Sequence, residues 1–167
     1  IFYRRNFSPM KIVSGGQTGV DRAALDAALN RSAEIGGWCP QGRRAEDGVI
    51  DEKYTLQETP KDTYRQRTQW NVRDSDGTLV LTRGVPFGGT AQTIEFARDL
   101  KKPYLVIDME QREPSKKQIE VIKYWVSMHA VQTLNVAGPR EINGSTVYKQ
   151  AYEWVDKILE MVNGVKH

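Results

Sequence analysis

The chain has few of the residues that build disulfides and metal sites. Its one cysteine, Cys39, can form no internal disulfide and no cysteine-based zinc site. Two histidines, His129 and His167, are too few and too far apart to suggest a metal cluster, so we predict no metal site. No apolar run approaches the roughly 18 residues that a membrane span needs, and no stretch has the pattern of a signal peptide. We therefore expect a cytoplasmic protein without membrane contact.

An excess of one charge is also lacking. The 167 residues include 24 basic and 21 acidic side chains, which give a net charge of +3 with the two signs well mixed. This balance is a weak argument for a polyanionic partner. The length is sufficient for one domain with a sizeable core. Residues 1–9 (IFYRRNFSP) offer no apolar core of their own, so we expect an N-terminal extension there and a single domain over residues 10–167, with Met10 as a natural start.

Short apolar runs alternate with segments of helical periodicity along most of the chain. The expected strands are residues 11–14, 77–82, 103–108 and 133–137, with a weak strand within 33–39. The expected helices are residues 19–31, 91–102, 115–129 and 147–163, whereas residues 40–75 look polar and irregular. This alternation predicts a three-layer α/β, Rossmann-like domain with a mostly parallel sheet. Because ligands bind beyond the carboxyl ends of parallel strands, the loops after residues 14, 82, 108 and 137 should meet at one edge.

Two glycine-rich turns are expected at that edge. SGGQTGVD (14–21) follows the first strand, and PFGGT (86–90) precedes the helix expected at 91–102. Helix N-termini carry unpaired N–H groups and a partial positive charge, which suit an oxyanion. Thr18 with Asp21 resembles a capping box, and Thr90 can cap the second helix. Either turn alone could be a tight connection without a ligand, but two on one edge favour an anion site between them.

Three arginines could add positive charge to this site. Arg140 in GPRE (138–141) could bind a phosphate bidentately or form a surface salt bridge. Arg83 follows the strand at 77–82, and Arg43 lies in a glycine-rich loop whose mixed charge is also typical of a solvated surface. The stretch RQRTQWNVR (65–73) could bind single-stranded nucleic acid by stacking and charge. The low net charge favours a subunit contact or a solvated strip instead, so we expect no nucleic acid partner.

Five segments together resemble the molybdenum carrier (molybdenum cofactor carrier protein) family, within the lysine-decarboxylase-like, Rossmann-type nucleotide-binding superfamily. They are SGGQTGVDRAALDAAL (14–29), GGWCPQGRRAEDG (36–48), SDGTLVLTRG (75–84), GGTAQTIEFA (88–97) and LNVAGPRE (134–141). The resemblance covers nearly the whole chain from Lys11. It implies a protein that binds the molybdenum cofactor, a pterin bearing a phosphate and an oxo-molybdenum dithiolene. It also implies a homo-oligomer, a dimer or tetramer, and molybdoenzymes as acceptors.

The predicted ligand is therefore a small anion: the molybdenum cofactor through its pterin phosphate, or otherwise a phosphate or nucleotide. The predicted binding residues are Gly15, Gly16, Gln17, Thr18, Gly19, Asp21, Arg43, Arg83, Gly88, Gly89, Thr90 and Arg140. A homo-oligomer is also suggested by Trp70, Tyr124 and Trp125, which a single small domain need not bury fully.

An alternative function follows from the same superfamily resemblance. Its phosphoribohydrolases release a base from a nucleoside 5′-monophosphate and carry the pattern P-G-G-x-G-T-x-x-E with a catalytic Glu. In this chain Thr93 stands where that Glu is expected, and Glu95 lies two residues further, about 200° around a helix. The displacement favours a binding protein with no catalytic residue. If the chain is a hydrolase, Glu95 or Asp21 is the candidate acid, and whether Glu95 points into the pocket separates the two functions. A nucleic-acid-binding module is a weaker third possibility.

Overall fold

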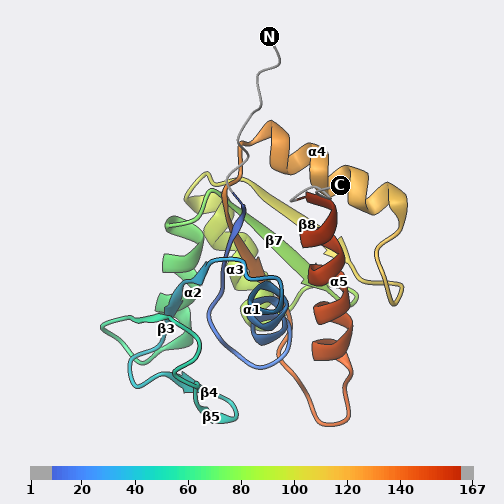
Figure 1. Ribbon diagram of the computed structural model, residues 1–167. Helices are drawn as coiled ribbons and strands as arrows, with labels where there is room; N and C mark the ends of the chain where they lie inside the picture. The colour runs from blue at the N-terminus through green and yellow to red at the C-terminus, as the bar shows by residue number, and fades with distance from the viewer. Residues whose placement is uncertain (1–8, 163–167) are drawn as a thin grey trace.

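The computed structural model describes residues 9–162, and its centre is a five-stranded sheet (Figure 1). All neighbouring strands are parallel. In spatial order they are β2 (Ile35–Gly36), β1 (Lys11–Val13), β9 (Thr133–Ala137), β7 (Gly77–Thr82) and β8 (Tyr104–Asp108). The chain moves from β1 outward to β2 and from β7 outward to β8, and β9 returns between them. The order therefore reverses at β9, which is where ligands bind in sheets of this type.

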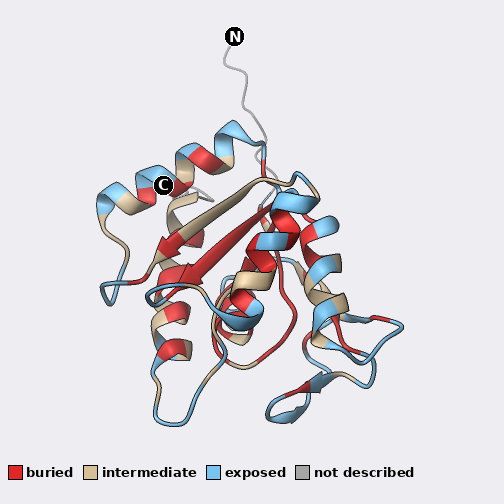
Figure 2. Ribbon diagram, turned by 180° about the vertical axis from the view of Figure 1, so that it is seen from behind, coloured by how far each residue is buried: buried red, intermediate tan, exposed pale blue. Residues whose placement is uncertain are grey.

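Helices flank both faces of the sheet (Figures 1 and 2). The main core receives the apolar faces of α1 (Val20–Asn30), α4 (Lys116–Met128) and α5 (Val147–Val162). A smaller cluster joins α2 (Tyr64–Arg73) to α3 (Gly88–Asp99). The chain is thus a three-layer, Rossmann-like α/β fold, as the alternating pattern predicts.

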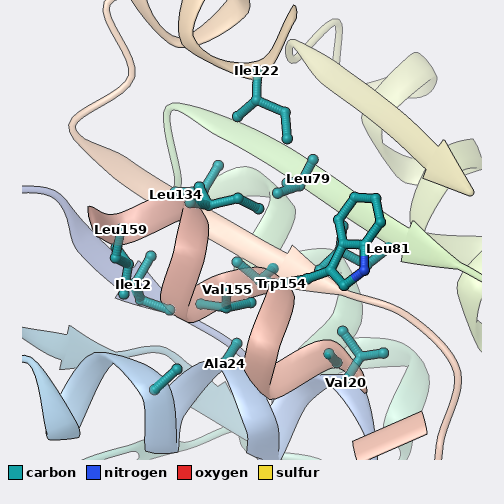
Figure 3. Packing of buried hydrophobic residues seen from close by; sticks show 14 of the residues in the cluster. Ile12, Val20, Ala24, Leu79, Leu81, Ile122, Leu134, Trp154, Val155 and Leu159 are labelled. Carbon is teal, nitrogen blue, oxygen red and sulfur yellow. The ribbon is translucent and has the colours of Figure 1, made fainter. Parts of the chain in front are cut away.

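The main core is dense because small residues of α1 face large residues of α5 and the sheet. Ala24 has no exposed surface and lies beside Val155 and Val20 (Figure 3). Trp154 is fully buried, and its indole N–H donates to the Gln111 carbonyl oxygen over 2.9 Å. The satisfied indole lets this large side chain fill the core without an unpaired polar atom.

A small irregular subregion extends from the edge of the sheet near β2. It contains the short pairs β3 (Trp38–Cys39) with β6 (Gln57–Glu58) and β4 (Arg44–Ala45) with β5 (Gly48–Val49). The Arg43 guanidinium holds the loop that follows. It donates hydrogen bonds to the carbonyl oxygens of residues 50, 51, 54 and 56.

The sequence predicts the strands at 77–82 and 133–137 with the bounds that the structure has, and helices α1, α4 and α5 to within two residues. Two expectations are wrong: residues 40–75 contain a helix, α2, and helix α3 begins at Gly88 instead of residue 91. The weak strand expected within residues 33–39 is present as β2, and β3 of the same stretch belongs to a second sheet. The expected extension lies outside the described residues, except for Pro9. Within residues 9–162, no helix has the length and apolar character needed to cross a membrane.

Candidate functional site

A cavity of about 290 Å³ lies at the carboxyl ends of β1, β9 and β7. Its walls come from the first glycine turn, the end of β9 with the loop after it, the start of α3, one face of α2 and the tip of the β4–β5 hairpin. The loops after residues 14, 82 and 137 therefore meet, as predicted. The loop after β8 does not contribute a lining residue; Asp108 instead accepts the Gly84 N–H.

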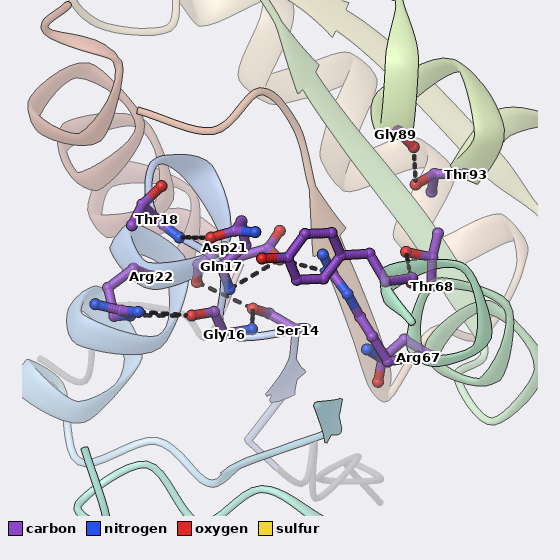
Figure 4. Close-up of polar contacts among 12 residues, drawn as sticks. Ser14, Gly16, Gln17, Thr18, Asp21, Arg22, Arg67, Thr68, Gly89 and Thr93 are labelled. Carbon is purple, nitrogen blue, oxygen red and sulfur yellow. Dashed lines mark hydrogen bonds and ion pairs between the residues drawn. The ribbon is translucent and has the colours of Figure 1, made fainter. Parts of the chain in front are cut away.

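Three N–H groups of the first glycine turn already have acceptors within the turn or the start of α1. The Gly16 N–H donates to the Ser14 hydroxyl, and the Gln17 N–H donates to an Asp21 carboxylate oxygen. The Thr18 N–H donates to the side-chain oxygen of Gln17 (Figure 4). Asp21 thus takes the place that we expected an external anion to take at the start of α1. Fewer N–H groups of residues 15–19 are therefore left for an external anion than the sequence analysis expects.

The expected threonine caps are wrong at both helices. Helix α1 starts after Gly19 with no side-chain cap, and the Thr18 hydroxyl instead accepts the Glu141 N–H at 3.3 Å. Helix α3 starts after Phe87, again with no side-chain cap, so Thr90 lies inside the first turn.

Asp21 forms a buried ion pair with a residue that the sequence analysis did not assign to the site. Arg67 of α2 donates from Nη1 to Asp21 Oδ2 over 3.0 Å, and the two side chains are 12% and 7% exposed. Burial raises the pKa of Asp21 above its usual range, while Arg67 and the Gln17 N–H act in the opposite direction. Figure 4 shows Arg67 reaching across from α2 toward Asp21.

The second glycine turn leaves its donors free. The N–H groups of Gly88, Gly89 and Thr90 belong to the first turn of α3, and no residue in the described part of the chain accepts them. That turn also carries no acidic residue, in contrast to Asp21 in α1. All three residues line the cavity. The N-terminus of α3 therefore presents unpaired N–H groups and a partial positive charge to the cavity, which are the features that suit an anion.

The three predicted arginines have different surroundings. Arg140 lines the cavity at its rim, where Nη1 contacts Glu46 Oε1 over 2.7 Å. Arg43 does not line the cavity, because its guanidinium binds the loop carbonyls described above. Arg83 does not line it either; it donates to Gln150 and Thr146 of the α5 region. Of the three, the structure brings only Arg140 to the site.

Only one of the two candidate acids, Glu95 and Asp21, lies at the cavity. Glu95 is exposed and is not a lining residue, whereas Asp21 is buried and lines the cavity. The Thr93 hydroxyl donates to the Gly89 carbonyl oxygen over 3.0 Å within α3. Of the two candidate acids, Asp21 is therefore the one that lines the cavity.

The arginines of residues 65–73 do not form the strip that nucleic acid binding would need. Arg67 faces Asp21, Arg65 lies over the Phe96 ring, and Arg73 pairs with Asp74 over 2.8 Å. The polar sequence of α2 shows little apolar periodicity, so the sequence gives no sign of the face that it buries. The role of Arg67 becomes evident only when Asp21 is seen beside it in the folded chain.

The fold defines a Rossmann-like α/β protein with a cavity at the point where the strand order of its sheet reverses. Residues 12–159 match the Circularly permutated YpsA SLOG family, and the chain belongs to that family. A solved structure of a protein named "Putative molybdenum carrier protein", from Syntrophus aciditrophicus SB, is 44% identical. The match covers 90% of this chain and 94% of that chain, with a TM-score of 0.84. The resemblance to molybdenum carrier proteins is thereby confirmed. A search of curated proteins gave no match.

Proposed function

We propose that this chain binds a small phosphate-bearing ligand, a pterin or a nucleotide, with its phosphate at the N-terminus of α3. The observation that carries this proposal is the set of three unpaired N–H groups at Gly88, Gly89 and Thr90 in the cavity wall. The contrast with α1, where Asp21 already accepts an N–H group of the preceding turn, supports α3 as the position of the external anion.

The remaining walls suit a planar ring system. The aromatic ring of Tyr64 lines the cavity, and Phe87 and Ile142 line it while remaining 67% and 54% exposed. The side-chain amides of Gln92 and Asn135 can hydrogen-bond the polar edge of a heterocycle. The volume lies at the lower limit of the roughly 300–1,000 Å³ typical of small-molecule sites, so a mononucleotide or a single pterin is the appropriate size.

The molybdenum cofactor is the ligand favoured by the name of the similar protein. Its pterin phosphate suits the three N–H groups of α3. Within residues 9–162, no group of three His, Cys, Asp or Glu side chains could hold a metal ion. The pterin's own dithiolene would therefore carry the metal, and the protein would hold the cofactor as cargo for molybdoenzymes.

Titration calorimetry with inorganic phosphate tests the anion position. Gly89→Val places a side chain where nothing lies within 4 Å, at a backbone conformation that any residue adopts, so the variant should fold. We expect its affinity for phosphate to fall at least about tenfold, because the side chain displaces the anion from the N–H groups. The matched control is Ala91→Val, which lies two residues further along α3 and does not line the cavity. Unchanged affinity in folded Gly89→Val contradicts the proposal.

The corresponding substitution in the first turn, Gly16→Val, would not report on ligand binding alone. Gly16 has a φ of 74°, and an added Cβ would lie 2.8 Å from Leu56 and 2.9 Å from Ile50. Gly16→Val should therefore destabilise the fold before it reports on binding.

A second candidate function is phosphoribohydrolase activity with Asp21 as the acid. The supporting observation is a buried carboxyl group in the cavity whose pKa is raised by burial, a feature of general acids. The exposed position of Glu95 supports binding without turnover. The test is release of free base from a panel of nucleoside monophosphates by wild type and Asp21→Asn. Turnover of about 1 per second or faster, lost in Asp21→Asn, would replace the carrier function with the hydrolase.

The homo-oligomer stays a prediction, and the residues that support it differ from those named in the sequence analysis. Trp125 is only 8% exposed and packs in the main core, so it no longer argues for a subunit contact. Val121, Tyr124 and Met128 of α4 are 43%, 69% and 66% exposed and recur at helical spacing. Light scattering at micromolar concentration distinguishes a dimer or tetramer from a monomer.

A further inference from the structure

Arg67 has more hydrogen-bond donors than its surroundings satisfy. A guanidinium has five N–H donors, and in the described part of the chain Asp21 alone accepts one, from Nη1. Nε is buried and has no acceptor among residues 9–162. Buried N–H groups in native proteins nearly always have a partner, so an unpaired one calls for a physical explanation.

The first glycine turn, α1 and a neighbouring residue of its own helix surround this guanidinium. Asp21 of α1 pairs with Nη1 at 3.0 Å, and the Tyr64 ring centroid lies 5.2 Å from Cζ. Gly15 in the first turn provides the space, because a Cβ there would lie 2.0 Å from Nη1. The side chain is therefore packed against the cavity wall that it helps to form.

We propose that Arg67 binds a second oxyanion of the ligand through its Nε–Nη2 edge, and that Asp21 is the positioning residue for Arg67. This inference rests on the proposed function, because it uses the same cavity. Arg67 lines the cavity, and its Nε–Nη2 edge holds the donors that Asp21 does not use. The proposal requires the guanidinium to turn this edge toward the cavity while Nη1 keeps its contact with Asp21. Two parallel N–H donors then match an oxyanion bidentately. A ligand with oxyanionic groups at both ends would occupy both positions, whereas a nucleoside monophosphate would occupy the α3 position alone.

The test is NMR observation of arginine Nε–H groups during titration of the wild-type protein with inorganic phosphate. We expect the Arg67 Nε–H resonance to shift and to saturate. Arg67→Lys keeps the positive charge for Asp21 but removes the fork, so phosphate affinity at this position should fall about tenfold or more. Arg65→Lys is the matched control, because Arg65 lies on the same helix but outside the cavity.

The role of Asp21 has its own readout. In Asp21→Asn the Arg67 Nε–H resonance should already differ without phosphate, because the partner that orients the guanidinium has changed. The loss of affinity in Asp21→Asn and Arg67→Lys combined should be smaller than the sum of the single losses, as for residues that act through one contact.

The outcomes separate this inference from the proposed function. If Gly89→Val loses phosphate and folded Arg67→Lys does not, the inference is wrong and the α3 site stands. If Arg67→Lys loses phosphate and Gly89→Val does not, Arg67 is the receptor and the α3 site is wrong. Should Arg67→Lys fail to fold, an unmoved Nε–H resonance in phosphate-saturated wild type overturns the inference. Absence of any phosphate binding by wild type contradicts both.

Discussion

Asp26 joins three elements through one carboxylate, and its removal has a predictable cost. Oδ1 accepts the Tyr54 hydroxyl and Oδ2 accepts the Tyr148 hydroxyl, both over 2.5 Å. Asp26 belongs to α1, Tyr54 to the irregular subregion and Tyr148 to α5. A hydrogen bond to a charged group contributes about 1.5–3 kcal/mol. Because Asp26 is half-buried and water can replace part of the loss, we expect Asp26→Ala to cost about 3 kcal/mol.

Equilibrium unfolding in urea at pH 7 measures this cost. A loss of about 3 kcal/mol corresponds to a fall in Tm of roughly 6–12 °C for a domain of this size. Tyr54→Phe and Tyr148→Phe each remove one of the two bonds and should each cost about half as much. The matched control is Asp156→Ala, which removes a partly exposed pair with Arg31 and should cost at most about 1 kcal/mol. A free energy of unfolding for Asp26→Ala within about 0.5 kcal/mol of wild type refutes the reasoning.

The hydrogen bonds between Asp26 and the two tyrosines predict that the folded protein loses stability at alkaline pH. Burial first, and Asp26 second, raise the pKa of Tyr54 and Tyr148 above the ordinary value of 10.0. The folded state therefore keeps these protons longer than the unfolded state does. Their contribution is fully present below pH 10 and is lost as the pH rises toward the raised pKa values. Ultraviolet titration of the folded protein should show two phenols that ionise later than free tyrosine. Ionisation of both near pH 10 would contradict this.

Three further substitutions test separate parts of the structure. Asp47→Asn removes an exposed pair in which the hydrogen bond from Arg22 lowers the pKa of Asp47. The substitution should lower the free energy of unfolding by about 0.5–1 kcal/mol at pH 7 and leave it unchanged at a pH below the lowered pKa. An equal loss at both pH values refutes the coupling between Arg22 and Asp47. Gly138→Ala places a Cβ 2.2 Å from the Leu81 carbonyl oxygen and should cost about 1–3 kcal/mol in chemical denaturation, so an unchanged midpoint contradicts the close approach. Arg43→Met should speed hydrogen exchange in residues 50–56 without changing phosphate affinity, and a tenfold loss of affinity would return Arg43 to the site.

The parts of the fold that follow from sequence are those with a clear apolar period. Strand 77–82 is apolar or β-branched after Gly77, and strand 133–137 is so except for Asn135. Helices α1, α4 and α5 each have a buried apolar stripe. Helix α4 begins with a capping box of Ser115 and Gln118. Helix α2 was missed because only two of its residues are fully buried and most of the rest are polar.

The candidate site is less predictable, because it depends on which donors are already paired. The two glycine turns look alike in sequence, yet Asp21 accepts an N–H group in one and no acid lies in the other. Arg43 and Arg140 are equally basic in the sequence, but only the folded chain brings Arg140 to the cavity. Arg67 could not be assigned, since its partner Asp21 lies 46 positions away in the chain.

The most direct test of the central claim is native mass spectrometry of the wild-type chain with a nucleoside monophosphate, beside Gly89→Val. It reports binding and turnover in the same spectrum. The account predicts one intact ligand on each wild-type chain and a strongly reduced adduct on Gly89→Val. An adduct of equal intensity on both chains contradicts the phosphate position at α3. An adduct whose mass corresponds to the ligand without its base shows that the ligand is hydrolysed instead of carried.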